Sequence, residues 1–199
     1  MSKALSTLTA RARLINQREK GLPLLLAADS ALFLFLLSAY LIARIASPSW
    51  PRPLHFPSGL MTVAMIMFAL AASGTMRVAV TYAKQKDFVM TQRMIALAVV
   101  GWCTFLFLLA MEWARLYFFE HLQLLSNPWN IPALGISYYG LTGIHAAHVL
   151  AGCIWLIAAS QHMGRWRLLG LEIYIHYVNA VFLVIAFLLI FSSMDLNGF

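Results

Sequence analysis

The sequence predicts an all-α, polytopic membrane protein with five transmembrane helices, and three observations support this prediction. Of the 199 residues, 62% are hydrophobic and only 11% are charged, and the chain contains five long apolar runs. Soluble domains carry roughly 45–50% apolar and about 25% charged residues. The runs are continuous rather than alternating, and about 20 apolar residues cross a hydrocarbon core as a helix, so helices are expected rather than barrel strands.

The five expected helices follow one another with short breaks. They cover residues 24–45, 58–83, 94–117, 136–160 and 173–193. Proline interrupts the chain after the first and the third, in the segments 47–53 and 127–132, because proline lacks a backbone donor and clashes with the preceding turn. Short polar turns at 84–87 and 164–167 separate the other pairs.

The chain before the first helix is polar and basic, and it lacks the apolar core and cleavage site of a signal peptide. We therefore expect residues 1–22 to form a cytoplasmic amino-terminal arm and residues 23–199 to form one five-helix domain. Eleven of the 14 Lys and Arg residues fall on the side of this arm when the five helices are threaded through a membrane. Positive residues accumulate on the cytoplasmic side, so the amino terminus is predicted in the cytoplasm and the carboxyl terminus in the periplasm. The net charge of +7 then belongs to membrane loops and does not indicate a nucleic-acid partner.

Ionisable and amide side chains inside the predicted helices are candidate functional residues, because burying them in lipid is costly. They fall into two groups by depth. The group toward the cytoplasmic side consists of Asp29, Arg77, His176 and Asn179, and the group toward the outer side consists of Glu112, His145 and His148. In each group two residues are three positions apart and so share a helix face.

Simpler structural interpretations of these candidate residues are also open. Arg77 is as compatible with snorkelling to the interface as with a buried ion pair. Interhelical hydrogen bonding by His145 and His148 is favoured over metal binding, because no carboxylate or cysteine pattern completes a site around them. Asp29 has to pair with a cation such as Arg77, take up a proton or contact a polar lipid group.

The two cysteines, Cys103 and Cys153, lie singly in apolar runs, and the chain has no CxxC motif. Neither a disulfide nor a thiolate metal site is therefore indicated. We expect both to be small, buried apolar side chains.

The fourth predicted helix carries the most specific motif. Residues 137–152 read SYYGLTGIHAAHVLAG, which closely resembles the signature of the haem–copper oxidase subunit III family: an aromatic residue, L-T-G-x-H-x-x-H-V, a small residue and glycine. The third helix ends in Glu112-Trp113, similar to the glutamate and aromatic residue of that family at the same place.

Three further segments are similar to the same family in the same order. Residues 72–77 (ASGTMR) are similar to its serine-rich segment, residues 174–179 (YIHYVN) to its Y-W-H-F-V-D, and residues 27–30 (AADS) to its Ala-Ser-Glu. The resemblance extends from Pro23 to the end of the chain and fits the five-helix bacterial form. Three positions depart from it: Asp29 replaces a glutamate, as in some quinol-oxidase members, Ile175 replaces a tryptophan, and Asn179 replaces an aspartate.

The resemblance implies a subunit that has no catalytic residue, carries no haem or copper, and binds phospholipid. Its partners would be the catalytic subunit I and subunit II of a terminal oxidase in the bacterial inner (plasma) membrane, supplied with electrons by cytochrome c or quinol. Family members hold lipid in a V-shaped cleft between the first two helices and the last three, and they support proton uptake and oxygen access. On this basis Asp29, Arg77, His176 and Asn179 are expected to be lipid-binding or proton-related, and Glu112, His145 and His148 to form a buried polar cluster.

Three alternatives stay open. Accessory subunits of nitric oxide reductases share this fold. A haem-carrying membrane anchor would use His145, His148 and His176 as axial ligands, but two of these lie toward the outer side and one toward the inner side. A small transporter would favour inverted repeats and interrupted helices, and neither is evident.

Overall fold

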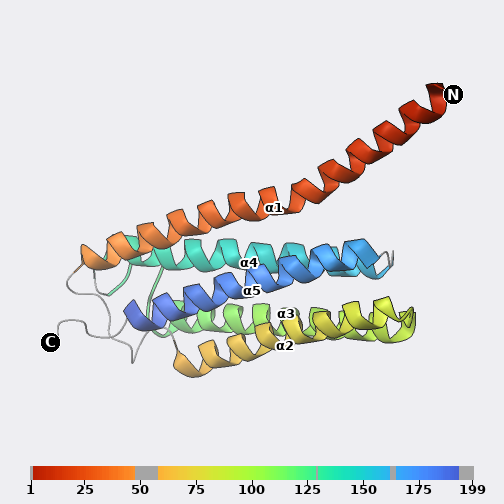
Figure 1. The fold of residues 1–199 in the computed structure, drawn as a ribbon. Coiled ribbons are helices and arrows are strands. Elements are labelled where there is room, and N and C mark those ends of the chain that lie inside the picture. The colour runs from red at the N-terminus through yellow and green to blue at the C-terminus, as the bar shows by residue number, and fades with distance from the viewer. Residues whose placement is uncertain (1, 48–57, 129, 162–164, 193–199) are drawn as a thin grey trace. The chain divides into compact units, whose positions relative to one another are not determined.

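The computed structural model describes the backbone of residues 2–47, 58–128, 130–161 and 165–192, and the side chains of residues 21–47, 58–128, 130–131, 133–161 and 168–190. Five helices occupy this part of the chain: α1 (Ser2–Ile45), α2 (Gly59–Lys84), α3 (Phe88–Phe118), α4 (Pro132–Ser160) and α5 (Arg165–Ser192) (Figure 1). Each contains a stretch long and apolar enough to cross a membrane. The predicted all-α fold with five spans is confirmed, and the cytoplasmic placement of the amino terminus stays a prediction.

α2 and α3 form a hairpin, and a side-chain cap marks the start of each helix. Ser58 precedes α2 and accepts a hydrogen bond from the Met61 amide at its Oγ (3.5 Å), and Asp87 precedes α3 and accepts one from the Met90 amide (3.0 Å). Serine and aspartate are preferred here because they satisfy amides that have no partner inside the helix. Lys86 has a left-handed φ of 62°, which helps reverse the chain between the two helices.

The loop between α3 and α4 is closed by Asn127. Its Nδ2 donates to the Ile131 carbonyl (2.7 Å), and its Oδ1 accepts from the Ile131 amide (3.1 Å). Pro132 follows as the first residue of α4, where a missing backbone N–H removes no intrahelical bond. The proline-rich break predicted in this region therefore contains the start of α4.

Four helices begin before the predicted spans, and α4 does so by only four residues, at Pro132 rather than at residue 136. α1 runs through the segment expected to be a polar arm, with Pro23 inside it. α3 begins at Phe88 rather than at residue 94, and α5 begins at Arg165 rather than at residue 173. Polar residues lower the hydropathy of these segments, but helical hydrogen bonds continue through them. The predicted end of the fifth span at residue 193 lies outside the described residues.

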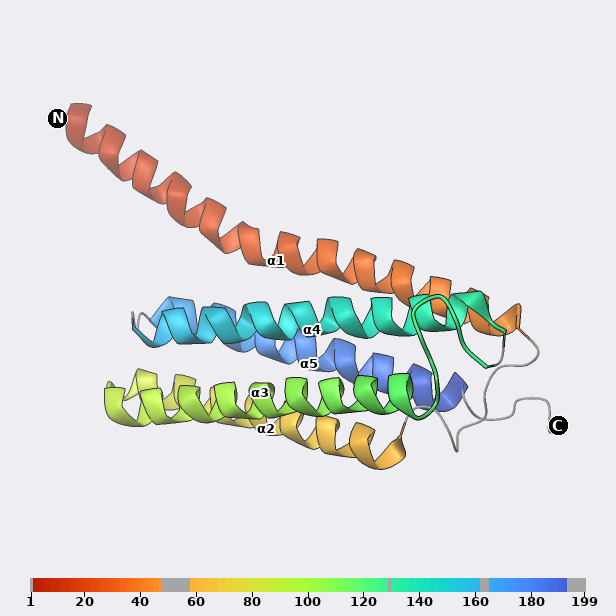
Figure 2. The same ribbon diagram turned by 180° about the vertical axis from the view of Figure 1, so that it is seen from behind.

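The chain divides into two compact units, residues 1–35 and 36–199. The described part of the first unit is one helical segment, in which Ser30 Oγ donates to the Leu26 carbonyl (2.7 Å). In the second unit, α2 packs against α3 and α5, and α4 packs against the same two helices. Figures 1 and 2 show these four helices side by side.

This packing corrects the expected cleft between the first two helices and the last three, because α2 lies directly against α3 and α5. Small side chains permit the contact. Ala69, Ala72 and Ala79 of α2 are buried, and a Cβ added at Gly101 of α3 would lie 3.3 Å from the Cβ of Ala72. Small residues let membrane helices approach closely. The predicted V-shaped separation is therefore wrong for α2.

The interior of the second unit is aromatic and aliphatic. Its largest fully buried side chains include Trp102, Tyr138, Phe105, Met76, Ile95 and Leu116. Large apolar side chains also face outward on all four of its complete helices, for example Leu60, Phe107 and Phe187. Soluble monomers rarely expose apolar patches of this extent, so the outer surface suits lipid or the apolar face of another membrane protein.

Candidate functional site

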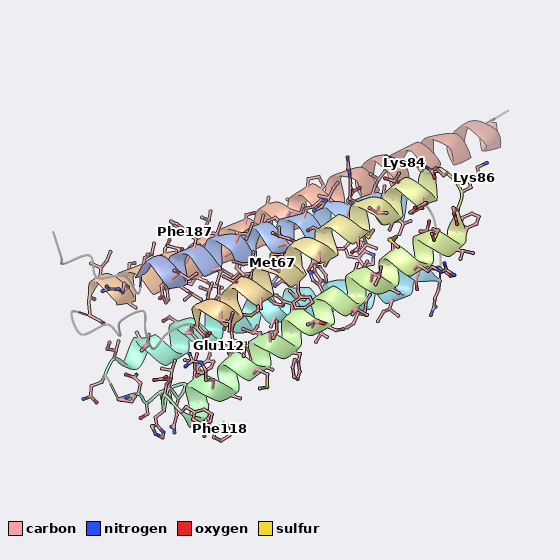
Figure 3. The ribbon with its side chains drawn as sticks, turned by 90° about the horizontal axis from the view of Figure 1, so that it is seen from below. Met67, Lys84, Lys86, Glu112, Phe118 and Phe187 are labelled. Atoms are coloured by element: carbon pink, nitrogen blue, oxygen red, sulfur yellow. The ribbon has the colours of Figure 1, made fainter. Side chains whose placement is uncertain are left out.

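Within the described part of the second unit, three groups of polar side chains are each joined by ion pairs or hydrogen bonds. Figure 3 labels Glu112 and Phe118 in the carboxyl-terminal part of α3, and Lys84 and Lys86 at the opposite end of the α2–α3 hairpin. We call the three groups the Arg77 cluster (Arg77, Glu172, His176), the Asn179 network (Asn179, Trp102, Ser73, Ala69) and the Glu112 cluster (Glu112, Arg115, Glu120, Ser58).

The Arg77 cluster joins α2 to α5 through a buried carboxylate. Arg77 Nη1 donates to Glu172 Oε1 at 2.6 Å, and His176 Nε2 lies 3.9 Å from the same oxygen. The Glu172 side chain is 4% exposed, whereas those of Arg77 and His176 are 70% and 45% exposed. Glu172 and His176 are four residues apart, so they project from one face of α5. The cluster therefore presents two basic groups outward over one buried acid.

The Asn179 network joins three helices in the interior. Asn179 Oδ1 accepts from Trp102 Nε1 of α3 (3.0 Å), and its Nδ2 donates to Ser73 Oγ (2.8 Å) and to the Ala69 carbonyl (2.6 Å) of α2. Asn179, Trp102 and Ser73 are all buried. Buried polar groups are costly unless they are hydrogen-bonded, and here both ends of the amide are satisfied.

The Glu112 cluster lies where α2 begins and α3 nears its end. Arg115 approaches the Glu112 carboxylate with two nitrogens, Nε to Oε2 (3.1 Å) and Nη2 to Oε1 (2.9 Å), and its Nη1 reaches Glu120 Oε1 at 3.0 Å. The Ser58 amide also donates to Glu112 Oε1 (2.9 Å). Glu112 is fully buried, and such two-point arginine pairing is among the strongest ways to compensate a carboxylate. The cluster thereby ties the start of α2 to α3.

The two histidines of α4 have surroundings of a different kind. The buried ring of His145 packs edge-on against Phe105 (centroids 5.6 Å apart) and stacks on Phe182 (5.3 Å). His148 Nδ1 lies 2.8 Å from the Ile144 carbonyl, and the His148 carbonyl accepts from the Tyr174 hydroxyl (3.1 Å). These contacts connect α4 to α3 and α5. The Glu112 carboxylate, by contrast, forms its ion pair with Arg115 of its own helix.

Asp29 lies in α1 and is half-buried. It belongs to the first compact unit, which is described by itself, and its pairing with Arg77 stays a prediction.

Two acidic partners and one arginine did not appear among the candidates drawn from the sequence. Glu172 fell just outside the span predicted to begin at residue 173, although its four-residue spacing from His176 was a usable signal. Arg115 and Glu120 follow Glu112 at spacings that a helix and its following turn bring together. Their roles follow from where the helices end, which hydropathy locates poorly.

Comparison with curated proteins shows that the chain is similar to cytochrome c oxidase subunit 3 of Synechocystis sp.. The two are 27% identical over 186 residues, which cover 86% of this chain and 73% of the relative. No protein-family model matches the chain.

Proposed function

We propose, from the premise that the chain belongs to the haem–copper oxidase subunit III family, that it is the non-catalytic third subunit of a bacterial terminal oxidase. One observation carries this proposal: a chain with five helices suited to cross a membrane is similar to cytochrome c oxidase subunit 3 over 86% of its length. The same observation supports a multi-pass membrane protein that works within an oxidase complex. We place that complex in the plasma membrane, with the amino terminus of this chain in the cytoplasm.

In this proposal the haem and copper belong to partner subunits, and the catalytic subunit I and subunit II pack against the outer faces of this chain. The electrons reach the complex from cytochrome c or from quinol. Support for such packing comes from the apolar side chains that face outward, including Leu60, Phe107 and Phe187. An apolar helix face in a membrane is covered either by acyl chains or by another helix.

The Arg77 cluster is the proposed place for a phospholipid headgroup. The Arg77 guanidinium is anchored by Glu172 at 2.6 Å, yet its side chain is 70% exposed, and the exposed His176 stands beside it. Charge-assisted hydrogen bonds from a guanidinium to phosphate oxygens are short and strong. Lipid held there would support proton uptake, and its acyl chains would support oxygen access because apolar phases dissolve oxygen better than water does. Asp29 on α1 is a separate candidate for proton uptake.

The test is purification of the native complex through an affinity tag on this chain. We expect a haem-bearing catalytic subunit and a copper-bearing subunit to co-purify, identified by subunit mass spectrometry and an absorption spectrum, and the preparation to consume oxygen. Recovery of the chain without any haem-bearing partner would contradict the proposal. Reduction of nitric oxide in place of oxygen would instead assign the complex to the nitric oxide reductases.

A further inference from the structure

Cys103 of α3 and Cys153 of α4, the two cysteines of the chain, lie together across the contact between these helices. Each thiol is close enough to influence the other electrostatically. The expectation that both are buried holds for Cys153, but Cys103 is exposed on the outer surface of the bundle. The structure therefore brings two thiols that are 50 positions apart in the sequence to the same contact between helices.

The residues beside the two cysteines show the same register independently. The indole ring of Trp102 lies so close to Gly152 that an added Cβ would stand 2.1 Å from a ring carbon. Only a glycine leaves room for that ring, so α3 and α4 meet closely at the level of Trp102 and Gly152. Cys103 and Cys153 are the next residues on each helix.

A groove between the same two helices gives a second indication. It has a volume of about 370 Å³ and is lined on α3 by residues that include Val99 and on α4 by Ile157 and Ser160. Cys103 lies four residues after Val99, and Cys153 lies four residues before Ile157. α3 and α4 run antiparallel (Figure 2), so both steps lead one turn in the same direction along the groove. Cys103 and Cys153 therefore lie on the same helix faces as the residues that line the groove, one turn further along.

We propose that Cys103 and Cys153 form a dithiol site that hydroperoxides oxidise to a disulfide joining α3 to α4. The Cys103 sulfur attacks the peroxide, so that an S–O bond forms, the O–O bond breaks, and the displaced oxygen leaves as an alcohol, or as water from hydrogen peroxide. The Cys153 sulfur then displaces the hydroxyl group of this sulfenic acid, which leaves as water with the Cys153 proton. Two thiols and one hydroperoxide thereby give one disulfide, one water and one alcohol.

The environment of each thiol suits its step. Cys103 is exposed, so an uncharged oxidant in the membrane reaches it first, and Cys153 is buried beside it to complete the bond. Thiols and disulfide are all uncharged, so closing the bond leaves no charge in an apolar place. A disulfide needs Cβ atoms roughly 3.5–4.5 Å apart. That separation is set by the two backbones, so it requires α3 and α4 to approach closely, as they do at Trp102 and Gly152.

The test uses the full chain in its native membranes. Membranes are treated with tert-butyl hydroperoxide, denatured in detergent, and reacted with a maleimide carrying a heavy polymer tag. Without oxidant the chain takes up two tags. With oxidant we expect a monomeric chain that takes up no tag, is lighter by two hydrogen atoms in intact mass, and regains both tags after reduction with dithiothreitol.

A relocated thiol is the matched control. Cys103→Ala combined with Ala110→Cys keeps an exposed thiol on α3 but moves it seven residues, about 10 Å along the helix, and it should not lose the two hydrogens. Cys103→Ser and Cys153→Ser, each with one cysteine, show whether oxidation of a single thiol explains any loss of tags. Two tags on the wild-type chain after oxidation, or equal closure in the relocated variant, would overturn the proposal.

Discussion

At the scale of single residues, Asn179 shows why an amide stands where the oxidase subunit III family that the chain resembles usually has an aspartate. Its oxygen accepts from the Trp102 indole, and its nitrogen donates to the Ala69 carbonyl at 2.6 Å. A carboxylate would face that carbonyl with a second acceptor, which the site cannot satisfy. The amide therefore fits this position through its two-sided hydrogen bonding, without any charge.

Replacing this amide tests its contribution to stability. We expect Asn179→Leu to lower the free energy of unfolding by about 1–3 kcal/mol, because the buried Trp102 N–H and the groups on α2 lose their partner. Asn179→Asp should be similarly costly. Ala180→Leu, at the exposed neighbouring position, is the control and should change little. Denaturant titration of the purified protein in detergent measures the difference, and equal midpoints for the Asn179 and Ala180 variants would contradict it.

The roles proposed for Arg77 and Asp29 concern how long the activity is sustained rather than the initial turnover rate. We expect Arg77→Gln and Asp29→Ala each to leave the initial turnover of the complex near wild type and to shorten the time for which activity is sustained. The reason is that lipid and proton supply support turnover without taking part in oxygen reduction. Oxygen consumption is followed to inactivation at saturating electron donor. Arg93→Gln, which removes an exposed cation of α3, is the control, and a wild-type lifetime in both test variants would rule out this role.

At the scale of helices, the α2–α3 hairpin is fixed at both ends. Asp87 caps α3 at the turn. At the opposite end Ser58 caps the start of α2, and its amide donates to the Glu112 carboxylate near the end of α3. Small residues between these ends, including Ala72 and Gly101, keep the two helices close. The hairpin is thus specified by local caps, by close packing and by one buried acid.

Glu112 and Glu120 allow a direct comparison of a buried and a partly exposed carboxylate, since both contact Arg115. We expect Glu112→Gln to reduce the free energy of unfolding by about 1.5–3 kcal/mol, because hydrogen bonds from Arg115 and Ser58 to a buried charge are weakened. Glu120→Gln should reduce it by less than about 1 kcal/mol, because that carboxylate is partly exposed. Detergent-phase unfolding of both variants checks the order, and a larger loss for Glu120→Gln would contradict it.

At the scale of the whole molecule, the excess of Lys and Arg predicts which loops face the cytoplasm. An alkaline phosphatase reporter fused after Leu125, in the loop between α3 and α4, should be active because that loop is expected in the periplasm. The same reporter fused after Gln85, in the α2–α3 turn, should be inactive. Enzyme assays of whole cells measure both fusions together. The reverse pattern would invert the predicted orientation.

The arrangement of the four complete helices in the second unit also changes where lipid is expected. Since α2 packs against α3 and α5, and α4 against the same pair, no cleft separates α2 from the later helices. Lipid would then lie on the outer faces, where Arg77 and His176 are exposed. The location follows from helix packing, which only the assembled fold specifies.

The sequence was enough to predict the five helices, the family resemblance and the list of costly polar residues. It could do so because hydropathy over about 20 residues and motif spacing are local properties. The partners of these residues emerged only from the helix packing: Glu172 for Arg77, and Trp102 and Ser73 for Asn179. Those contacts depend on which helix faces meet and at what register, and side chains far apart in the chain are brought together only when the helices pack.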